Sequence, residues 1–420
     1  MNAVPSVDIN LATIAPLGDV LLSKLDAIRA VDPVFWSDLS RCWIVTGHEA
    51  VTEGFSGKLP LLNGKMESLL QRVLPEDELR RRIPNTLRIM PHILPNLDGG
   101  KHAILRKLFV KAFSRKLVEN VRPYVRERVA AVLDRAAAEG DIEFNEGVAR
   151  QIPGAVILRI LGMPESYIDR LKWWTDGTTQ ALVSFDPLPD ALDKLEAVIN
   201  DMIETFTPLI EERRAEPRAD FLSALVHASE GGVSLGFDEL IASLNLLVVA
   251  GHDTTSNSMT LGIRALARHP DAWNYLRDNP DRSVDAAIEL MRYIAMSAVQ
   301  PRMAESDFEW RGHQIKQNDI LMLFIAGGNR DPDAYQDPDR LDFARANDRT
   351  LTFGPGVHHC IGHMLAKLQM GEFLAALTQR FDRVEVLEEP SWVPNLIFRS
   401  VDGLRIRFHS NQQSANGGRT

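Results

Sequence analysis

Cys360 lies in a segment whose residue types could bind a metal and adjust its reactivity. Residues 353–362 read FGPGVHHCIG, and a helical pattern follows directly. The N-terminus of a helix offers unpaired N–H groups and partial positive charge, which favour a thiolate and can donate hydrogen bonds to a metal-bound sulfur. Gly354, Gly356 and Gly362 would let a flat macrocycle approach the backbone closely. The alternative is that Cys360 is a small buried hydrophobe beside an ordinary turn.

Asp253 and Thr254 form a second candidate, for proton transfer. They interrupt an apolar helical segment, residues 246–255, which reads LLVVAGHDTT. A buried carboxylate needs partners or a function, and Thr254 can donate to a carbonyl one turn earlier, opening the helix beside Ala250 and Gly251. The alternative is an exposed cap between two successive helices.

Glu289 and Arg292 are spaced i,i+3, which puts an acid and a base on one face of a helix. Such a pair is usually a solvated salt bridge that contributes little to the stability of the fold. The spacing alone therefore assigns no function to them.

The elements that must position these residues are mostly helices. Apolar periodicity predicts helices over residues 101–116, 121–138, 192–214, 237–268 and 361–377. Short strands are expected at 34–37, 42–45, 308–310, 313–315 and 319–324. A long loop, roughly residues 330–359, leads to Cys360, and loops of that length usually serve function. The fold class predicted is mainly α with a small β-sheet region (α+β).

The chain as a whole reads as one large domain, residues 1–410, followed by a flexible tail, 411–420. It has 420 residues, a net charge of -10 and two cysteines, too few for a disulfide framework. The acidic balance argues against binding to nucleic acid or an anionic membrane. An apolar run long enough to span a bilayer and a signal peptide are both missing, so we expect a cytoplasmic protein without a membrane anchor.

The segment around Cys360 resembles the haem-binding signature of the cytochrome P-450 family, Phe-Gly-x-Gly-x-His-x-Cys-x-Gly followed by Leu365 and Ala366. The resemblance implies that haem b (iron protoporphyrin IX) lies between a long central helix and the cysteine loop, with Cys360 as the iron ligand. Thiolate ligation favours cleavage of the O–O bond. The family often has arginine after Leu-Ala, whereas Lys367 stands there in this chain.

Two further segments are similar to family motifs, in the order the family has them. Residues 250–255 resemble its oxygen-activating motif, which implies that Asp253 gates protons and Thr254 supports their delivery to dioxygen. The second resembles the Glu-x-x-Arg motif, which implies a buried network of Glu289 and Arg292 completed by an arginine before the cysteine, for which Arg340 is the candidate.

The resemblance also assigns the cofactor-binding residues. The haem propionates are expected to contact His102, Arg106, Arg302 and His358, and the backbone at Gly354 and Gly362 is expected to approach the macrocycle. Carboxylates drawn into an apolar cavity need charged donors. The alternatives are a solvated basic helix face and a solvent-facing loop histidine.

By position along the chain, eight residues match the family's substrate-recognition segments: Met90, Ile93, Leu246, Val249, Ala250, Ser297, Ala298 and Val401. Together they favour a hydrophobic small molecule, with Ser297 as a polar anchor. Core packing explains each one individually. Where the family commonly has Ser-Pro, this chain has Ala295-Met296, which changes the local shape of the pocket.

The implied activity is a monooxygenase that inserts one atom of O2 into a hydrophobic substrate of terpenoid, steroid, fatty-chain or aromatic type. Electrons would come from a ferredoxin with its reductase, docking near the basic segment 101–116. The alternatives are a haem-thiolate peroxygenase or non-oxygenating enzyme, and a protein that only sequesters an apolar ligand. A phosphate loop at residues 354–356 is disfavoured, because no Lys-Ser/Thr follows and Pro355 lacks an N–H.

Overall fold

The computed structural model describes residues 7–14, 18–63, 74–182, 189–346 and 348–410. The expected tail, 411–420, lies outside the described residues. Most of the described chain is helical, as predicted: α1 (Leu11–Ile14), α2 (Val20–Val31), α3 (His48–Phe55), α5 (Glu76–Arg82), α6 (Pro84–Ile89), α7 (Gly99–Ala112), α8 (Arg115–Glu139), α9 (Gln151–Leu161), α10 (Ile168–Leu182), α11 (Pro189–Ala215), α12 (Phe221–Val226), α13 (Phe237–Ala267), α14 (Pro270–Asp278), α15 (Ser283–Ile294), α16 (Ile325–Gly328) and α17 (His363–Arg380).

The strands form small separate sheets rather than one continuous layer. The largest sheet has the order β1-β2-β10-β7-β3 and a second has the order β11-β14-β4. The first contains β1 (Val34–Ser37), β2 (Cys42–Val45), β10 (Ile320–Leu323), β7 (Gln300–Ala304) and β3 (Leu61–Leu62); the second contains β11 (Phe381–Glu388), β14 (Arg405–Ser410) and β4 (Asp141–Glu143). The remaining described strands pair two by two: β5 (Ser229–Glu230) with β6 (Val233–Ser234), β8 (Phe308–Trp310) with β9 (His313–Ile315), and β12 (Ser391–Trp392) with β13 (Val401–Asp402).

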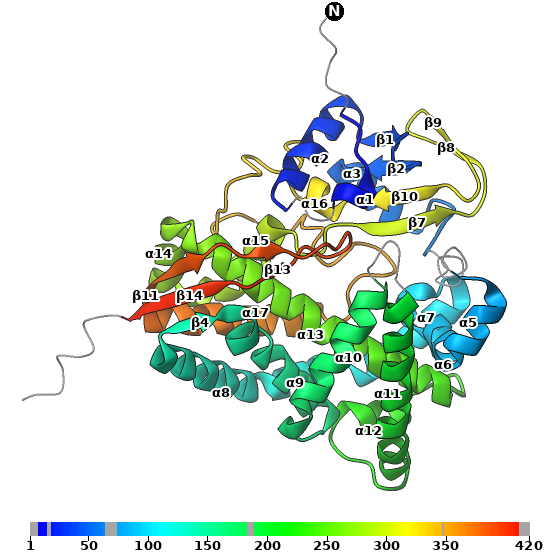
Figure 1. Cartoon of the computed structure of the whole chain (residues 1–420), viewed down its shortest axis with the longest axis horizontal. Helices are drawn as coiled ribbons and strands as arrows, with labels where there is room; N and C mark the ends of the chain where they lie inside the picture. The colour runs from blue at the N-terminus through cyan, green and yellow to red at the C-terminus, as the bar shows by residue number, and fades with distance from the viewer. Residues whose placement is uncertain (1–6, 15–17, 64–73, 183–188, 347, 411–420) are drawn as a thin grey trace, which may run out of the picture.

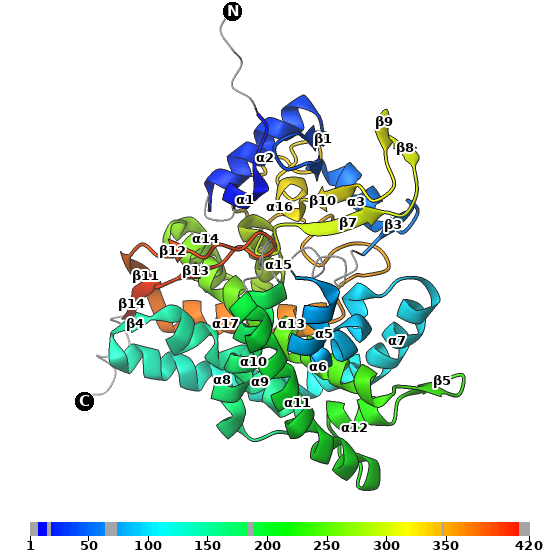
Figure 2. The same cartoon turned by 45° about the vertical axis from the view of Figure 1, so that its right-hand side comes forward.

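The helix α13 runs through the middle of the helical body, and the five-stranded sheet lies at one end of the molecule together with α2, α3 and α16 (Figure 1). Helices α9, α10, α15 and α17 all contact α13. A helix surrounded in this way is apolar on nearly every face, which explains the long apolar run in its sequence. The turned view shows that the hairpin beginning with β5 projects from the body near α7 and α12 (Figure 2).

The predicted helix over residues 101–116 is two helices. Helix α7 ends at Ala112 and α8 begins at Arg115, because the side chain of Ser114 accepts a hydrogen bond from Leu117 N and caps the second helix. The apolar periodicity of the sequence continues across the break between the two helices. The capping residue Ser114 was therefore the local signal that a new helix begins there.

None of the described helices is both long and apolar enough to cross a membrane.

Candidate functional site

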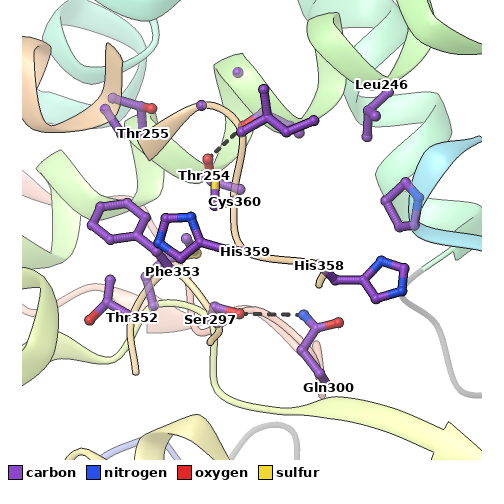
Figure 3. A pocket seen from close by; sticks show the side chains of 18 of the residues that line it. Leu246, Thr254, Thr255, Ser297, Gln300, Thr352, Phe353, His358, His359 and Cys360 are labelled. Atoms are coloured by element: carbon purple, nitrogen blue, oxygen red, sulfur yellow. Dashed lines mark hydrogen bonds between the residues drawn. The ribbon is translucent and has the colours of Figure 1, made fainter. Parts of the chain in front are cut away.

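A cavity of about 350 Å³ lies between α13 and the loop that ends at Cys360. Side chains far apart in the sequence, including Leu246, Ser297 and His358, line it (Figure 3). The walls are mainly apolar with a few polar groups, the usual composition of a site for a small molecule or cofactor.

Cys360 lines this cavity just before α17 begins at His363. Its backbone N–H donates to Phe353 O at 2.8 Å, which fixes the end of the loop. Burial raises the pKa of the thiol, while the N–H groups of Gly362 and His363 donate to the sulfur and, with Arg106, lower the pKa. A positive charge in the cavity would be needed to make the thiolate the dominant form, and a bound metal supplies one.

The three glycines of the loop serve two different purposes. A Cβ on Gly356 would lie 2.1 Å from Phe55 O, and φ there is +82°, so protein packing demands this glycine. Gly354 and Gly362 line the cavity, and a Cβ on either would meet no described atom closer than 3.8 Å. Only these two therefore keep the backbone open toward the cavity.

The cavity wall carries two arginines and two histidines, and one acid outside the lining, Asp98, lies near them, 3.7 Å from His358 Nε2 and within charge interaction of Arg302. Arg106, Arg302, His102 and His358 line it, and none of the described residues that line it is an aspartate or glutamate. Burial lowers the pKa of Arg302 to about 10, so this guanidinium remains charged at neutral pH. Two cations facing an apolar cavity match a ligand with two carboxylates, which is what haem b carries.

The contacts of His102, His358 and Arg106 are consistent with binding the carboxylates of a ligand. The Nε2 atom of His102 is buried without a hydrogen-bond partner among the described residues. The His102 ring lies 4.0 Å from that of His358, and Arg106 donates to His359 O at 2.5 Å. Buried polar groups are normally paired, so an unpaired nitrogen on a cavity wall fits a polar ligand.

Thr254 lines the same cavity, and its hydroxyl donates to Ala250 O at 2.6 Å. The hydroxyls of Ser256, Ser258 and Thr260, which follow on α13, make the same bond one turn back, as does Ser243 nearer the start of the helix. Side chains that compete in this way for helix carbonyls bend and loosen a helix. The structure nevertheless shows α13 as one continuous helix over Phe237–Ala267, so the predicted local opening stays a prediction.

Asp253 does not line the cavity but lies behind Thr254, on the side of Arg150. Burial raises the pKa of Asp253 to about 6, while Arg150 and a hydrogen bond from Asn257 at 3.2 Å oppose this. Arg150 in turn pairs with Asp176, which is half exposed. Asp253 is thus a carboxyl that titrates near neutral pH between the cavity and the surface.

His252 anchors this part of α13, a role that sequence reasoning did not assign. The ring is fully buried, with Nδ1 3.1 Å from Thr175 Oγ1 and Nε2 3.1 Å from Arg150 O. Burial lowers its pKa to about 3, so the ring is neutral. A histidine inside an otherwise apolar helical run was the available signal.

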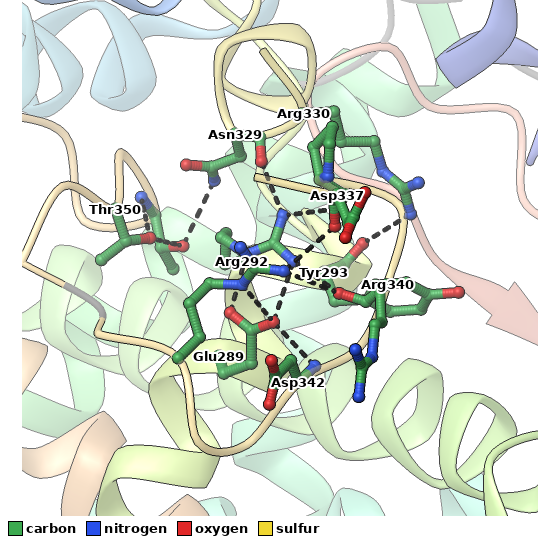
Figure 4. A network of polar contacts seen from close by, with 12 residues as sticks. Glu289, Arg292, Tyr293, Asn329, Arg330, Asp337, Arg340, Asp342 and Thr350 are labelled. Carbon is green, nitrogen blue, oxygen red and sulfur yellow. Dashed lines mark hydrogen bonds and ion pairs between the residues drawn. The ribbon is translucent and has the colours of Figure 1, made fainter. Parts of the chain in front are cut away.

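Glu289 and Arg292 are fully buried and paired, with Arg292 Nε 2.7 Å from Glu289 Oε2 (Figure 4). The expectation that Arg340 completes the ion pair is wrong. Arg345 does so, with Nε 3.2 Å from Glu289 Oε1, whereas the Arg340 side chain is exposed and only its carbonyl oxygen accepts from Arg292, at 3.2 Å. The loop turns after Pro338, which carries the Arg340 side chain outward.

Arg292 also binds the loop that leads to the cysteine. It donates to Asn329 O at 2.7 Å and to Pro338 O at 2.9 Å. The Asn329 side chain accepts from Leu351 N at 2.8 Å. The buried pair thus organises the segment preceding Cys360 through backbone carbonyls.

The eight expected pocket residues divide into two groups. Leu246, Ala250 and Ser297 line the cavity. The other five are not among its lining residues, and four of them are buried in the core with at most 6 % of their surface exposed: Met90, Ile93, Ala298 and Val401, with Val249 half-buried. The four buried ones pack in the core, and the expected contact of all five with a ligand stays a prediction.

Sequence reasoning missed several residues that do line the cavity. They are Leu94, Pro95, Leu247, Met296, Gln300 and Phe398. Gln300 Nε2 donates to Ser297 Oγ at 3.4 Å, which makes a small polar pair in an apolar wall (Figure 3). Ala295 has a left-handed backbone with φ of 45°, and this turn presents Met296 and Ser297 to the cavity.

Comparisons with known proteins agree with this geometry. The family model described as Cytochrome P450 matches residues 80–397. The chain is 31% identical to Cytochrome P450 CYP107DY1 of Priestia megaterium, over 76% of this chain and 77% of that protein. It is also 31% identical to the Vitamin D3 dihydroxylase of Streptomyces griseolus, over 86% and 85%. Among solved structures, P450BioI in complex with hexadec-9Z-enoic acid ligated acyl carrier protein is similar with a TM-score of 0.85 and 26% identity, covering 96% of this chain and 100% of that one.

Proposed function

Because the chain belongs to the cytochrome P450 family and is therefore a haem b monooxygenase, we propose that it inserts one atom of O2 into a hydrophobic small molecule, by hydroxylation. The mainly apolar wall formed by Leu94, Leu246, Leu247 and Phe398 supports an extended apolar substrate. Similarity to a vitamin D3 dihydroxylase favours a substrate of steroid or fatty-chain type. The Ser297–Gln300 pair would bind one polar group of such a substrate.

Cys360 is proposed as the iron ligand, and His102, Arg106, Arg302 and His358 as the donors to the propionates. When bound, haem b supplies the activation of dioxygen. His102, Arg106, Arg302 and His358 would hold its carboxylates, the lack of side chains at Gly354 and Gly362 would leave room for it, and the apolar lining side chains would exclude water. Each of these functions follows from the lining residues and their charges.

Thr254 and Asp253 are proposed to move protons. The Thr254 hydroxyl lies on the cavity wall, and its bond to Ala250 O leaves its oxygen free to accept a further hydrogen bond. Asp253, with a pKa of about 6, would take up and release a proton on the side of the Arg150–Asp176 ion pair, whose guanidinium stays charged throughout. A carboxyl that titrates near the working pH is suited to this transfer.

A ferredoxin with its reductase is proposed as the electron donor, and a cytoplasmic location is proposed with it. The docking patch is smaller than the sequence implied, because Lys107 and Lys111 of α7 pair with Glu230. Arg115 and Lys116 remain exposed and outside every ion pair found among the described residues. These two, next to the start of α8, would carry the attraction for an acidic partner.

The observation that carries the proposal is that one cavity is lined by Cys360 and by two arginines, with no aspartate or glutamate among its described lining residues. The test is the absorption spectrum of the reduced, carbon monoxide-treated protein, which reports whether a thiolate coordinates the iron. We expect the thiolate signature in the native chain and its loss in Cys360→Ala. An unaltered signature in Cys360→Ala would refute the assignment.

The oxidant that supports turnover distinguishes a monooxygenase from the peroxygenase alternative. Turnover that requires both O2 and an electron donor supports the monooxygenase. Turnover supported equally well by peroxide alone would favour the alternative.

A further inference from the structure

A second cavity, of about 300 Å³, lies away from Cys360 between the end of α13, the end of α15 and β12. It shares none of its described lining residues with the first cavity. Four arginines line it, two from the end of α13 and two from loops: Arg264, Arg268, Arg330 and Arg399.

The positive charge of this cavity exceeds its negative charge. The acids that pair with the four guanidinium groups are Asp19, Asp339 and Glu389. A further lining acid, Asp26, pairs with Arg29. Three of the arginines, Arg264, Arg268 and Arg399, share the two acids Asp19 and Glu389, and cations that outnumber their carboxylates in a partly buried space favour a bound anion.

Two of the arginines are more deeply buried than the acids that pair with them. Arg330 and Arg399 are 9% and 6% exposed, whereas the side chains of Asp19 and Asp339 are 52% and 69% exposed. The carboxylates therefore satisfy the arginines from the outer side. They can turn toward solvent when a stronger anion arrives, because little packing holds them.

Two buried nitrogens at this site lack a partner within the described part of the chain. The Nε atoms of Arg330 and Arg399 are buried and make no hydrogen bond there, although the terminal nitrogens of both side chains do. An arginine has five donors in a fixed fork, and a tetrahedral oxyanion can satisfy several of them at once.

We propose that this second cavity binds a phosphoryl group, as free phosphate or as the phosphate of a small organic molecule. The Trp392 ring, 4.9 Å from the guanidinium of Arg399 and 5.3 Å from that of Arg264, forms an aromatic wall beside the cations. It would cover the organic part of a phosphate ester.

Arg399 connects this site to the first cavity. Its backbone N–H donates to Met296 O at 2.7 Å, and Phe398 forms a bridge with Ser297. Met296, Ser297 and Phe398 all line the first cavity. An anion that holds the Arg399 side chain therefore stabilises the segment against which a ligand in the first cavity packs.

The site is tested by calorimetric titration of the haem-loaded protein with inorganic phosphate, at an ionic strength held constant with chloride. We expect saturable binding that is weakened about tenfold by Arg268→Gln, since a charged donor is lost. Arg268 is half exposed, so this variant is expected to fold. The matched control is Arg277→Gln, at a partly exposed arginine of α14 outside the cavity, and this variant should bind phosphate normally.

Adenosine monophosphate distinguishes the two sources of the phosphoryl group. Tighter binding of the ester than of phosphate, with quenching of Trp392 fluorescence that Trp392→Leu removes, identifies an organic phosphate. Tighter binding of free phosphate identifies the inorganic anion. Absence of saturable binding by both, or equal affinities in native protein and Arg268→Gln, would overturn the proposal. Because no turnover is measured, failure here is independent of the proposed oxygenation.

Discussion

At the scale of single residues, the proposed proton transfer depends on two neighbouring side chains of one helix that point in different directions. Thr254 and Asp253 are adjacent in sequence, yet one lines the cavity and the other is turned toward Arg150. Successive helical residues point about 100° apart, so a single helix can present an alcohol to the reaction and a carboxyl to the proton source. The order of the two residues along the chain is thus part of the proposed mechanism.

Replacing Thr254 by alanine should uncouple electron use from product formation. Positioned proton donors contribute about 10²–10⁴-fold, so we expect product formed per NADH consumed to fall by about tenfold or more. Substrate affinity should change much less, because the methyl group of Thr254 is only one of many cavity contacts. Measuring NADH, product and peroxide together checks this, and Thr254→Ser, which keeps the hydroxyl, is the control. Equal coupling in all three proteins would exclude a proton-delivery function.

Replacing Asp253 by asparagine should stabilise the fold. Burial raises the pKa of Asp253 from 3.8 to about 6, so the folded state disfavours the charged form. The penalty is absent below the unfolded pKa, grows as the pH rises, and is complete above the folded pKa, where it amounts to about 3 kcal/mol. The uncharged amide that replaces the carboxylate would still accept the hydrogen bond from Asn257.

The free energy of unfolding, measured in urea, should therefore be higher in Asp253→Asn at pH 7.5 by about 3 kcal/mol, and by roughly half as much at pH 5. Turnover should fall in the same variant. A gain that does not depend on pH would show that the carboxyl is not desolvated as described.

At the scale of elements, the fold class, the long central helix and the cysteine loop were predictable from periodicity and turn residues. The third member of the Glu289–Arg292 network was not. Arg340 and Arg345 lie in one irregular loop, where no repeat relates spacing to side-chain direction. The division between core and pocket residues could not be predicted either. An apolar residue such as Met90 or Ala298 looks the same in a sequence whether it packs in the core or faces a ligand.

The finding that Arg345, and not Arg340, pairs with Glu289 can be tested by comparing two variants. Arg345→Gln should destabilise the chain by about 3–5 kcal/mol and lower the haem content, because Glu289 would retain a buried charge with one cation fewer. Arg340→Gln should change neither, since its side chain is exposed and its carbonyl oxygen is unaffected. Haem-to-protein absorbance ratios and urea midpoints of both variants decide the matter. Equal losses in the two would restore Arg340 to the network.

At the scale of the whole molecule, the net charge of -10 contrasts with the exposed cations Arg115 and Lys116. An acidic ferredoxin would be repelled by most of the surface and attracted at this place. Such local complementarity mainly raises association rates and is weakened by salt.

We therefore expect reduction by ferredoxin to slow as ionic strength rises from about 0.05 to 0.5 M, because salt shortens the distance over which the charges of the two proteins attract each other. Lys116→Ala should slow association about two- to fivefold, and Lys111→Ala less, because Lys111 is already paired with Glu230. Reduction by dithionite is the control and should be equal in all variants. A ferredoxin rate that is insensitive to salt would place the docking surface elsewhere.

The repeated hydroxyl-to-carbonyl bonds of α13 have a consequence for motion. From Thr254 to Thr260, every second residue shares a carbonyl that a backbone amide also needs. The amides of these turns should consequently exchange with deuterated solvent faster than those at residues 244–248 of the same helix, which carry no such side-chain bond among the described contacts. The most deeply placed helix of the protein would then contain a compliant section, and it lies where oxygen and substrate must be accommodated together.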